Sequence, residues 1–325
     1  MRCDKVYLVC DGGGTKTEYL LFDPSGRVHG RSRTGGTNAI FVNPEAAAEA
    51  VCGGISACLS QAEAGESDME GICLFIPGFG KSVDEVRKRF PHTALTVRGD
   101  EYNAYYGALG GPGGIAVLSG TGSFAVCRDA GGHWIKAGGW GPLFDDKGSG
   151  YHMGLLCLEK ITRRFDQGIS HTALQRSALK QLEMPDIPSL RRGAYRPDFT
   201  RERIARLSYA VAEAAGAGDA DALEILDTAA RCLAELAAVV AERMGTDCPP
   251  VSLTGGVSHM GSILTDRFET ALGQCLPRCT YQKPKYEPVV GAVLYVMYEI
   301  RNCGTLPETF LENLEKGMEK SHADG

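Results

Sequence analysis

Short apolar runs separated by glycine-rich turns open the chain, a pattern typical of buried strands. The first three predicted strands are Val6–Cys10, Glu18–Phe22 and Arg27–Arg33. Asn43 and Pro44 then mark the start of an alanine-rich helix, because asparagine can accept hydrogen bonds from the first turn and proline fits its first position. This helix is predicted to run to about Ala64.

Strands and helices alternate in the next segment, as expected for parallel strands joined by helical crossovers. The pattern predicts a strand at 71–76, a short helix after 82, a strand at 94–98 and a helix from 100 to 109. Ser82 and Glu85 have the spacing of a capping box, which predicts that they cap the short helix reciprocally.

The same plan begins again after the glycine-rich segment 110–114. Thr15 precedes the turn residue Asp23 by eight positions, and Thr121 precedes Asp129 by the same eight. Such internal repetition predicts two related lobes, each presenting a strand–glycine loop–strand hairpin towards a shared cleft. We therefore expect one lobe over 1–113 and a second over 114–287.

The second copy carries a large helical part and a closing helix. Helical periodicity predicts helices at 151–165, 170–182, 200–215 and 219–244, followed by a strand at 251–254 and a helix to about 272. Pro288 begins an apolar helix over 288–303, which we expect to pack back on the first lobe. Residues 304–325 form a polar tail, expected to be loosely docked or partly disordered.

Composition narrows the class of protein. The 325 residues carry a net charge of −6, which offers no basic face for nucleic acid, and no apolar run approaches the roughly 20 residues that span a bilayer. The 12 cysteines form no CxxC pair, which is typical of reduced thiols in a cytoplasmic protein. The 42 glycines cluster in loops after strands, where a backbone can come close to a ligand. We expect a cytoplasmic enzyme.

Two glycine loops could bind phosphate, because an anion is held by several backbone N–H groups at once. The candidate residues are Gly13, Gly14, Thr15 and Lys16 in the first loop, and Gly120, Thr121, Gly122 and Ser123 in the second. Lys16 or a bound Mg²⁺ could neutralise the phosphate charge, and Asp11 could supply an oxygen ligand to that ion. The alternative is that both loops are only tight hairpin turns.

Three further positions have both a structural and a functional interpretation. Asp100 is either the N-cap of its helix or the general base for a hydroxyl nucleophile. Trp140, set among glycines beside carboxylates, either stacks on a sugar ring or fills a core. Gly255 and Gly256 either admit a nucleoside base or only turn the chain from strand to helix. His152 is expected to be packed or solvated and not catalytic.

In this order the motifs resemble the sugar kinase/Hsp70/actin superfamily, and more narrowly the N-acetylglucosamine kinase group within the BadF/BadG-type ATPase family. The resemblance covers Val6 to about Cys303. It implies an α/β, two-lobed actin-like ATPase (ribonuclease H-like) fold with a duplicated βββαβαβα core. It also implies ATP and Mg²⁺ as cofactors, a small-molecule amino sugar as substrate, and a homodimer that binds neither nucleic acid nor membrane.

The resemblance also implies roles for individual residues. Asp100 falls on the catalytic aspartate of the family and Asp11 lies in its first phosphate loop, while Gly255 and Gly256 belong to the adenosine motif. The implied sugar contacts are Asn38, Asp100, Ser123, Gly139, Trp140 and Asp146. The sugar loop departs from the family at Asp145 and Lys147, where glycine and glutamate are usual.

We therefore expect an ATP-dependent kinase that phosphorylates a hydroxyl of an amino sugar, N-acetylglucosamine first and glucosamine next. A second possibility is an ATPase activator that couples ATP hydrolysis to electron transfer from an iron–sulfur cluster, which needs a ligand arrangement that the cysteines do not present. A third is a sugar sensor without catalysis.

Overall fold

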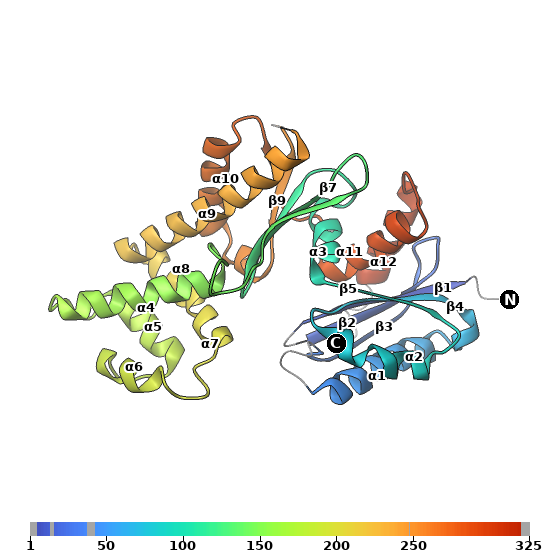
Figure 1. Ribbon diagram of the computed structural model, residues 1–325, viewed down its shortest axis with the longest axis horizontal. Helices are drawn as coiled ribbons and strands as arrows, with labels where there is room; N and C mark the ends of the chain where they lie inside the picture. Colours follow the sequence, from blue (N-terminus) through green and yellow to red (C-terminus); the bar gives the residue numbers. More distant parts are fainter. Residues whose placement is uncertain (1–4, 14–15, 38–42, 247, 320–325) are drawn as a thin grey trace. The chain divides into compact units, whose positions relative to one another are not determined.

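The computed structural model describes residues 5–13, 16–37, 43–246 and 248–319 (Figure 1). The chain divides into two compact units, one formed by Met1–Pro112 with Lys285–Gly325 and the other by Gly113–Pro284. Each unit contains one five-stranded sheet. Within the described ranges, no helix is long and apolar enough to cross a lipid bilayer.

The sheet of the first unit has the strand order β3-β2-β1-β4-β5. Its strands are β1 (Val6–Gly12), β2 (Lys16–Phe22), β3 (Val28–Gly35), β4 (Met69–Phe75) and β5 (Ala94–Arg98). The first three pair antiparallel, whereas β4 runs parallel to both β1 and β5. Since β1, β4 and β5 are parallel, their carboxyl ends meet at one edge of the sheet, which is where ligands bind in open α/β sheets.

Helices cover both faces of this sheet (Figure 1). On one face lie α1 (Pro44–Gln61) and α2 (Val83–Arg89), which enclose the core with alternate residues of the strands, such as Val6, Leu8 and Cys10 of β1. On the other lie α3 (Asp100–Leu109) and α11 (Pro288–Tyr295). The chain order β1-β2-β3-α1-β4-α2-β5-α3 confirms the predicted βββαβαβα core.

The helix starts show which capping predictions hold. The Asn43 carboxamide accepts hydrogen bonds from the N–H groups of Glu45 and Ala46, at 2.8 and 3.3 Å, as predicted. The capping box at Ser82 is wrong: its hydroxyl donates to the Pro44 carbonyl at 2.9 Å, so it ties α2 to the start of α1. Spacing along the sequence cannot detect this competing acceptor from a distant segment.

The carboxyl-terminal segments pack closely on the first unit. A Cβ on Gly291 of α11 would lie 2.0 Å from the Asn103 carbonyl oxygen of α3, so glycine lets the two helices touch. After α11 the chain makes a π-helical turn, Val296–Ile300. The loosely docked tail was a wrong prediction for its described part, because Glu308–Glu319 forms α12 and buries Phe310 and Leu314.

The sheet of the second unit has the equivalent order, β10-β9-β6-β7-β8. Its strands are β6 (Ile115–Ser119), β7 (Ser123–Arg128), β8 (Trp134–Gly138), β9 (Pro250–Thr254) and β10 (Thr280–Tyr281). Again the first three pair antiparallel and the last two add in parallel, which confirms the predicted duplication. The helices α9 (Ala220–Met244) and α10 (Ser262–Cys275) lie between the strands in sequence.

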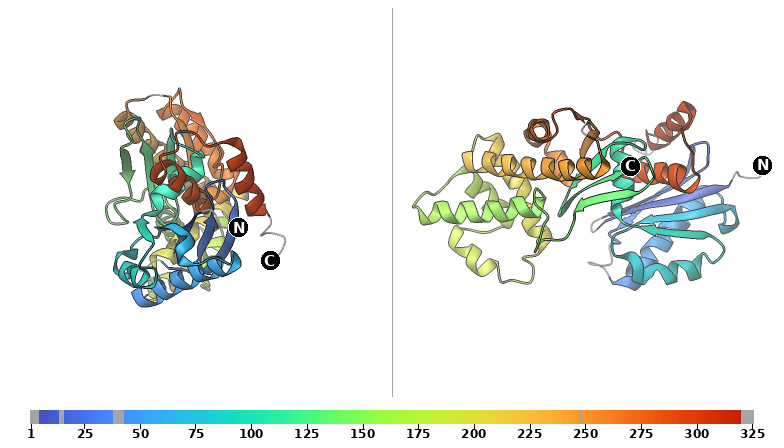
Figure 2. Two further views of the ribbon diagram at one scale, coloured as in Figure 1. Left: turned by 90° about the vertical axis from the view of Figure 1, so that its right-hand side faces the viewer. Right: turned by 45° about the horizontal axis from the view of Figure 1, so that its top comes forward.

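The helical part of this unit follows β8 and gathers beyond one end of the sheet (Figure 2). It comprises α4 (Gly150–Asp166), α5 (Ala173–Leu182), α6 (Ile187–Gly193), α7 (Arg201–Ala205) and α8 (Leu207–Gly216). The predicted single helix over 200–215 is two helices, broken at Arg206, and α6 was not predicted. This insertion brings α7 to the loop that follows β8, as described below.

Candidate active site

The first glycine loop joins β1 to β2 and is held by backbone contacts. The Gly13 N–H donates to the Lys16 carbonyl at 3.0 Å, and the Gly13 carbonyl accepts from the Thr37 N–H at 3.1 Å. The Thr17 and Thr37 hydroxyls lie 2.7 Å apart in the interior. These contacts fix both ends of the loop. The predicted site residues Gly14, Thr15 and Asn38 lie outside the described residues.

Asp11 is the last residue but one of β1, at the carboxyl edge of the sheet. The Asn103 carboxamide Nδ2 donates to its Oδ1 at 2.7 Å. Burial raises the pKa of Asp11 to about 6, the Asn103 hydrogen bond opposes that change, and the negative charges of Asp100 and Glu18 add to it. A carboxylate in such surroundings gains stability from any cation that binds beside it.

Lys16 does not supply that cation alone. Its ammonium lies 3.2 Å from a Glu18 carboxylate oxygen, and half of its side chain is exposed. Arg31 also approaches Glu18, at 3.8 Å. The positive charge of Lys16, which was predicted to neutralise the phosphates, is therefore partly compensated by Glu18.

Asp100 begins α3, directly after β5. The prediction that it caps this helix is wrong, because Gly99 occupies the N-cap position and Asp100 is the first helical residue. Before it, Arg98 donates from Nε to the Tyr295 hydroxyl at 3.1 Å, which fastens the end of β5 to α11. Asp11 thus lies near the end of β1 and Asp100 just after β5, and these parallel strands end at the same edge of the sheet.

Asn103 was missed by the sequence analysis. It lies three residues after Asp100, so both occupy one face of α3, and this spacing was the available signal. Its side chain is fully buried, donates to Asp11, and has no partner for Oδ1 among the described residues. A buried amide oxygen without a donor is uncommon, because buried polar groups are nearly always hydrogen-bonded.

The residues around Asp11 fit a magnesium ion that is held mainly by phosphate and water. Mg²⁺ prefers hard oxygen ligands and usually takes only one or two carboxylates from the protein. Asp11 offers such an oxygen, and the described part of the chain has no group of three or more acidic, histidine or cysteine side chains that could form a closed site.

The second glycine loop joins β6 to β7 and is fastened to the segment before α4. The Gly120 N–H donates to the Gly122 carbonyl at 2.9 Å, and the Gly120 carbonyl accepts from the Gly150 N–H at 2.8 Å. The Ser123 hydroxyl donates to the Lys147 carbonyl at 2.7 Å. Thr121 lies at the tip of this loop, between the two bonded glycines.

The predicted sugar loop follows β8 with several left-handed residues. Gly139 has φ +77°, and the Trp140 side chain is 79% exposed, so it does not fill the core of its own unit. Asp146 is also left-handed, at φ +64°, but is buried. Its Oδ1 accepts from the Ser123 N–H at 3.2 Å and its Oδ2 accepts from Arg201 at 2.5 Å.

Arg201 was also missed by the sequence analysis. It is the first residue of α7, 55 positions after Asp146, and no motif connects the two. Only the fold of the helical insertion brings it to the sugar loop.

The adenosine-motif glycines follow β9. Gly255 has φ +94°, and a Cβ there would lie 2.5 Å from the Ser119 carbonyl oxygen at the end of β6. Gly256 begins a short 3₁₀ helix, Gly256–Met260. The turn predicted from the sequence is present, and Gly255 is required by close backbone approach at the base of the second glycine loop.

His152 has a structural role in the same unit. Its Nδ1 accepts a hydrogen bond from the Gly148 N–H at 3.1 Å, which agrees with the prediction that it is packed. Burial, and then the charge of Lys147, lower the pKa of His152.

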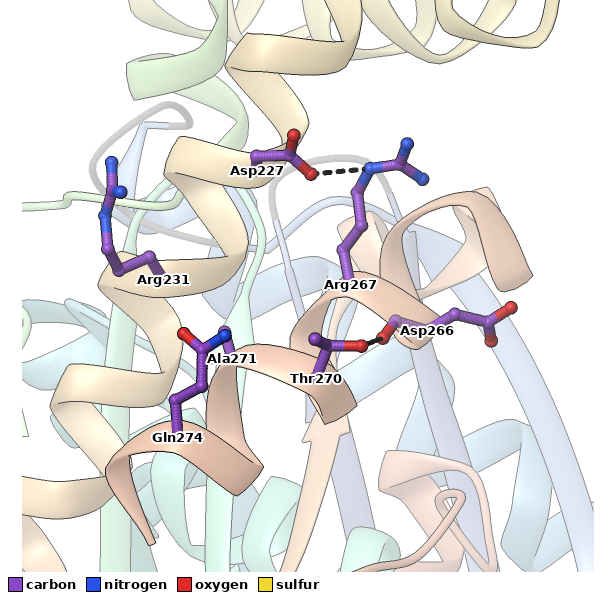
Figure 3. Close-up of a pocket in the computed structure, with 7 residues that line it drawn as sticks. All are labelled: Asp227, Arg231, Asp266, Arg267, Thr270, Ala271 and Gln274. Atoms are coloured by element: carbon purple, nitrogen blue, oxygen red, sulfur yellow. Dashed lines mark hydrogen bonds and ion pairs between the residues drawn. The ribbon is translucent and has the colours of Figure 1, made fainter. Parts of the chain in front are cut away.

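A hollow of about 330 Å³ lies between α9 and α10 (Figure 3). None of the predicted site residues lines it, and its residues are Asp227, Arg231, Asp266, Arg267, Thr270, Ala271 and Gln274. The Arg267 Nε lies 2.8 Å from an Asp227 carboxylate oxygen, so these opposite charges already compensate each other.

The comparisons with known proteins agree with one another, and each match covers most of the chain. The model of the BadF/BadG/BcrA/BcrD ATPase family matches residues 10–296. The N-acetyl-D-glucosamine kinase of Dictyostelium discoideum is 27% identical over 312 residues, which covers 90% of this chain and 98% of that protein. The N-acetylmuramic acid/N-acetylglucosamine kinase of Clostridium acetobutylicum is also 27% identical, over 91% of this chain and 99% of its own.

Among solved structures, a candidate N-acetylglucosamine kinase from Chromobacterium violaceum superposes with a TM-score of 0.71 at 27% identity. The match covers 90% of this chain and 98% of that one.

Proposed function

The chain belongs to the BadF/BadG/BcrA/BcrD ATPase family, and on this premise we propose that it is an ATP-dependent kinase that phosphorylates a hydroxyl of an amino sugar. N-acetylglucosamine is the first candidate and glucosamine the next. The fold is the actin-like ATPase fold, with the two compact units proposed as its two domains. Similarity to amino-sugar kinases over nine-tenths of the chain supports this activity.

The observation that carries the proposal is the placement of Asp100 and Asp11 at one edge of the first sheet. Asp100 is the proposed general base. It accepts the proton of the sugar hydroxyl while that oxygen forms a bond to the γ-phosphorus of ATP, and the bond from the γ-phosphorus to ADP breaks. The place of Asp100 in the first turn of α3, directly after β5 and Gly99, would set where its carboxylate lies for this step.

The glycine loops are the proposed phosphate sites. Gly13, Gly14 and Thr15 with Lys16 would hold phosphate oxygens from the first unit, and Gly120, Thr121 and Gly122 from the second. Gly255 and Gly256 are proposed to lie against the adenosine. The backbone bonds that fasten both loops support this assignment, because phosphoryl transfer depends chiefly on positioning and electrostatic stabilisation.

Asp11 is the proposed protein ligand for Mg²⁺, directly or through water. When bound, the ion would offset charge on the phosphates. Burial of Asp11 near two further carboxylates, which raises its pKa, supports a cation there.

The sugar is proposed to contact Asn38, Ser123, Gly139, Trp140 and Asp146 beside Asp100. The exposed Trp140 ring is suited to pack on sugar C–H groups. Ser123 and Asp146 are engaged with protein partners, so their contribution is proposed to come through the shape of the loop as well as through contact.

A screen of ADP release over a panel of sugars and amino sugars tests the proposal. Turnover is expected to be highest with N-acetylglucosamine and to require Mg²⁺. ADP release that no sugar stimulates would contradict a sugar kinase. Protein purified without oxygen that carries iron and sulfide would favour the ATPase activator instead.

We further propose a cytoplasmic location and a homodimer. The first is supported by the cysteines of the described residues, which are all unpaired as thiols and five of which are buried. The homodimer rests on the family resemblance, and measurement of the mass in solution tests it.

A further inference from the structure

Arg201 connects three segments of the second unit that are distant in sequence. It is carried by α7 of the helical insertion, and its Nη2 lies 2.5 Å from Oδ2 of Asp146 in the sugar loop. Asp146 in turn accepts from the Ser123 N–H at the end of the second glycine loop. The Arg201 guanidinium also lies over the Tyr151 ring, 5.8 Å from its centre.

The ion pair between Asp146 and Arg201 lies directly against the second glycine loop. A Cβ on Gly122 would be 2.7 Å from Oδ1 of Asp146 and 2.9 Å from Nη2 of Arg201. The Asp146 side chain is 3% exposed, whereas that of Arg201 is 35% exposed. A carboxylate buried to this degree depends on its cation, because removing one partner leaves an uncompensated buried charge.

We propose that Arg201 is a positioning residue for phosphoryl transfer, acting through Asp146 to hold the sugar loop against the second glycine loop. This inference rests on the proposed function. Asp146 adopts a left-handed backbone, which costs energy for any residue with a Cβ, although aspartate tolerates it better than most. The ion pair with Arg201 fixes this carboxylate together with the Ser123 N–H, and it thereby holds the Gly139–Ser149 segment that carries Trp140.

Arg201→Met, which removes the charge at similar length, tests the proposal. It is expected to lower kcat/KM for N-acetylglucosamine by about 10²-fold, the cost of a reacting group displaced by about an ångström. Arg201→Lys is expected to recover most of this loss. Only one guanidinium nitrogen contacts Asp146, and the Arg201 Nε has no partner among the described residues.

Arg203→Met is the matched control on the same helix. Arg203 pairs with Asp198 at 2.5 Å and donates to the Leu182 carbonyl at 2.7 Å, away from the sugar loop. We expect it to change kcat/KM by less than about twofold. Equal losses from Arg201→Met and Arg203→Met would overturn the proposal, because both would then reflect only the stability of α7.

A double-mutant cycle with Asp146→Asn separates action through Asp146 from direct action of Arg201. If Arg201 acts through Asp146, adding Arg201→Met to Asp146→Asn lowers kcat/KM no further. Losses that multiply would instead assign Arg201 its own contact with substrate and overturn the positioning role.

Fluorescence of Trp140 gives a readout that needs no turnover. In a Trp134→Phe background Trp140 is the remaining tryptophan, since the chain has two. Arg201→Met is expected to change its quenching by acrylamide, and Arg203→Met is not. If no amino sugar is phosphorylated the proposed function fails, but this measurement still decides the positioning role, and identical quenching of the two variants overturns it.

Discussion

The two glycine loops follow equivalent strands of the two units, yet different groups surround them. The first loop follows Asp11, whose pKa is raised by burial and by the charges of Asp100 and Glu18. The second is fastened by backbone groups, by hydroxyls such as that of Ser123, and by Asp146, whose charge an arginine already compensates. The duplication therefore kept the strands on either side of the loop and changed the electrostatics around it.

We propose that this difference gives the two units different tasks. A buried carboxylate with further negative charge around it gains stability from a bound cation, whereas one paired with an arginine is already compensated. The first unit is thus suited to bind a metal ion and to take up a proton. The second is suited to hold ligands by shape and by neutral donors. Substitutions in the first unit should affect kcat most, and those in the second should affect KM.

The largest effect is expected from Asp100→Asn. An amide cannot accept the hydroxyl proton, so kcat should fall by about 10³-fold, within the range for loss of a general base. Binding of ATP, measured by calorimetry, should survive. Glu101→Gln, the next residue of α3, is the control and should retain turnover. Retained turnover in Asp100→Asn would remove Asp100 from the mechanism.

Asp11→Asn should have the next largest effect. It replaces the proposed Mg²⁺ ligand, so kcat/KM for ATP should fall by about 10²-fold and half-maximal activity should need more Mg²⁺. A magnesium titration of the initial rate measures both. Asp68→Asn is the control, because Asp68 precedes β4 at the opposite edge of the same sheet. An unchanged magnesium requirement in Asp11→Asn would contradict the assignment.

The duplicated core could be predicted from the sequence because its strands and its repeat follow from patterns among residues that are close in sequence. Apolar runs give the strands, and the matched eight-residue offsets of Thr15 and Thr121 give the repeat. The glycine loops and Asp11 were found for the same reason, since each directly follows an apolar strand. The roles of the site residues remain proposals.

What the sequence could not predict depends on contacts between distant segments. Ser82 matches a capping box locally, but its hydroxyl donates to the Pro44 carbonyl, 38 residues earlier. Asn103 becomes a partner of Asp11 only when α3 packs beside β1, and Arg201 reaches Asp146 only through the folded insertion. No periodicity records such contacts, because they belong to tertiary structure.

In the second unit, Trp140→Ala should raise KM for the sugar by about tenfold, the contribution of one aromatic stacking contact. KM for ATP should stay within about twofold, because the change removes only a sugar contact. Phe144→Ala is a close control, since Phe144 is exposed on the same loop. Steady-state kinetics with each substrate varied in turn measures the effects. Equal changes for Trp140→Ala and Phe144→Ala would mean that only the shape of the loop matters.

The smallest effect concerns His152, which contributes a neutral acceptor to the second unit. Burial and the Lys147 charge lower its pKa, so the unfolded chain binds a proton more readily than the folded one. The stability that neutral His152 provides is therefore present above the ordinary histidine value of 6.5 and declines as pH falls below it towards the lowered pKa of the folded state.

His152→Gln should remove this pH dependence, because glutamine can accept from the Gly148 N–H and does not titrate. Urea unfolding at about pH 5.5 and pH 7.5 should show a greater loss of stability on acidification in the unsubstituted protein, by about 1 kcal/mol, the net value of one hydrogen bond. An equal loss in both proteins would mean that protonation of His152 does not loosen the Gly148 contact. The second loop would then owe its order to the Asp146–Arg201 pair and to the backbone bonds at Gly120.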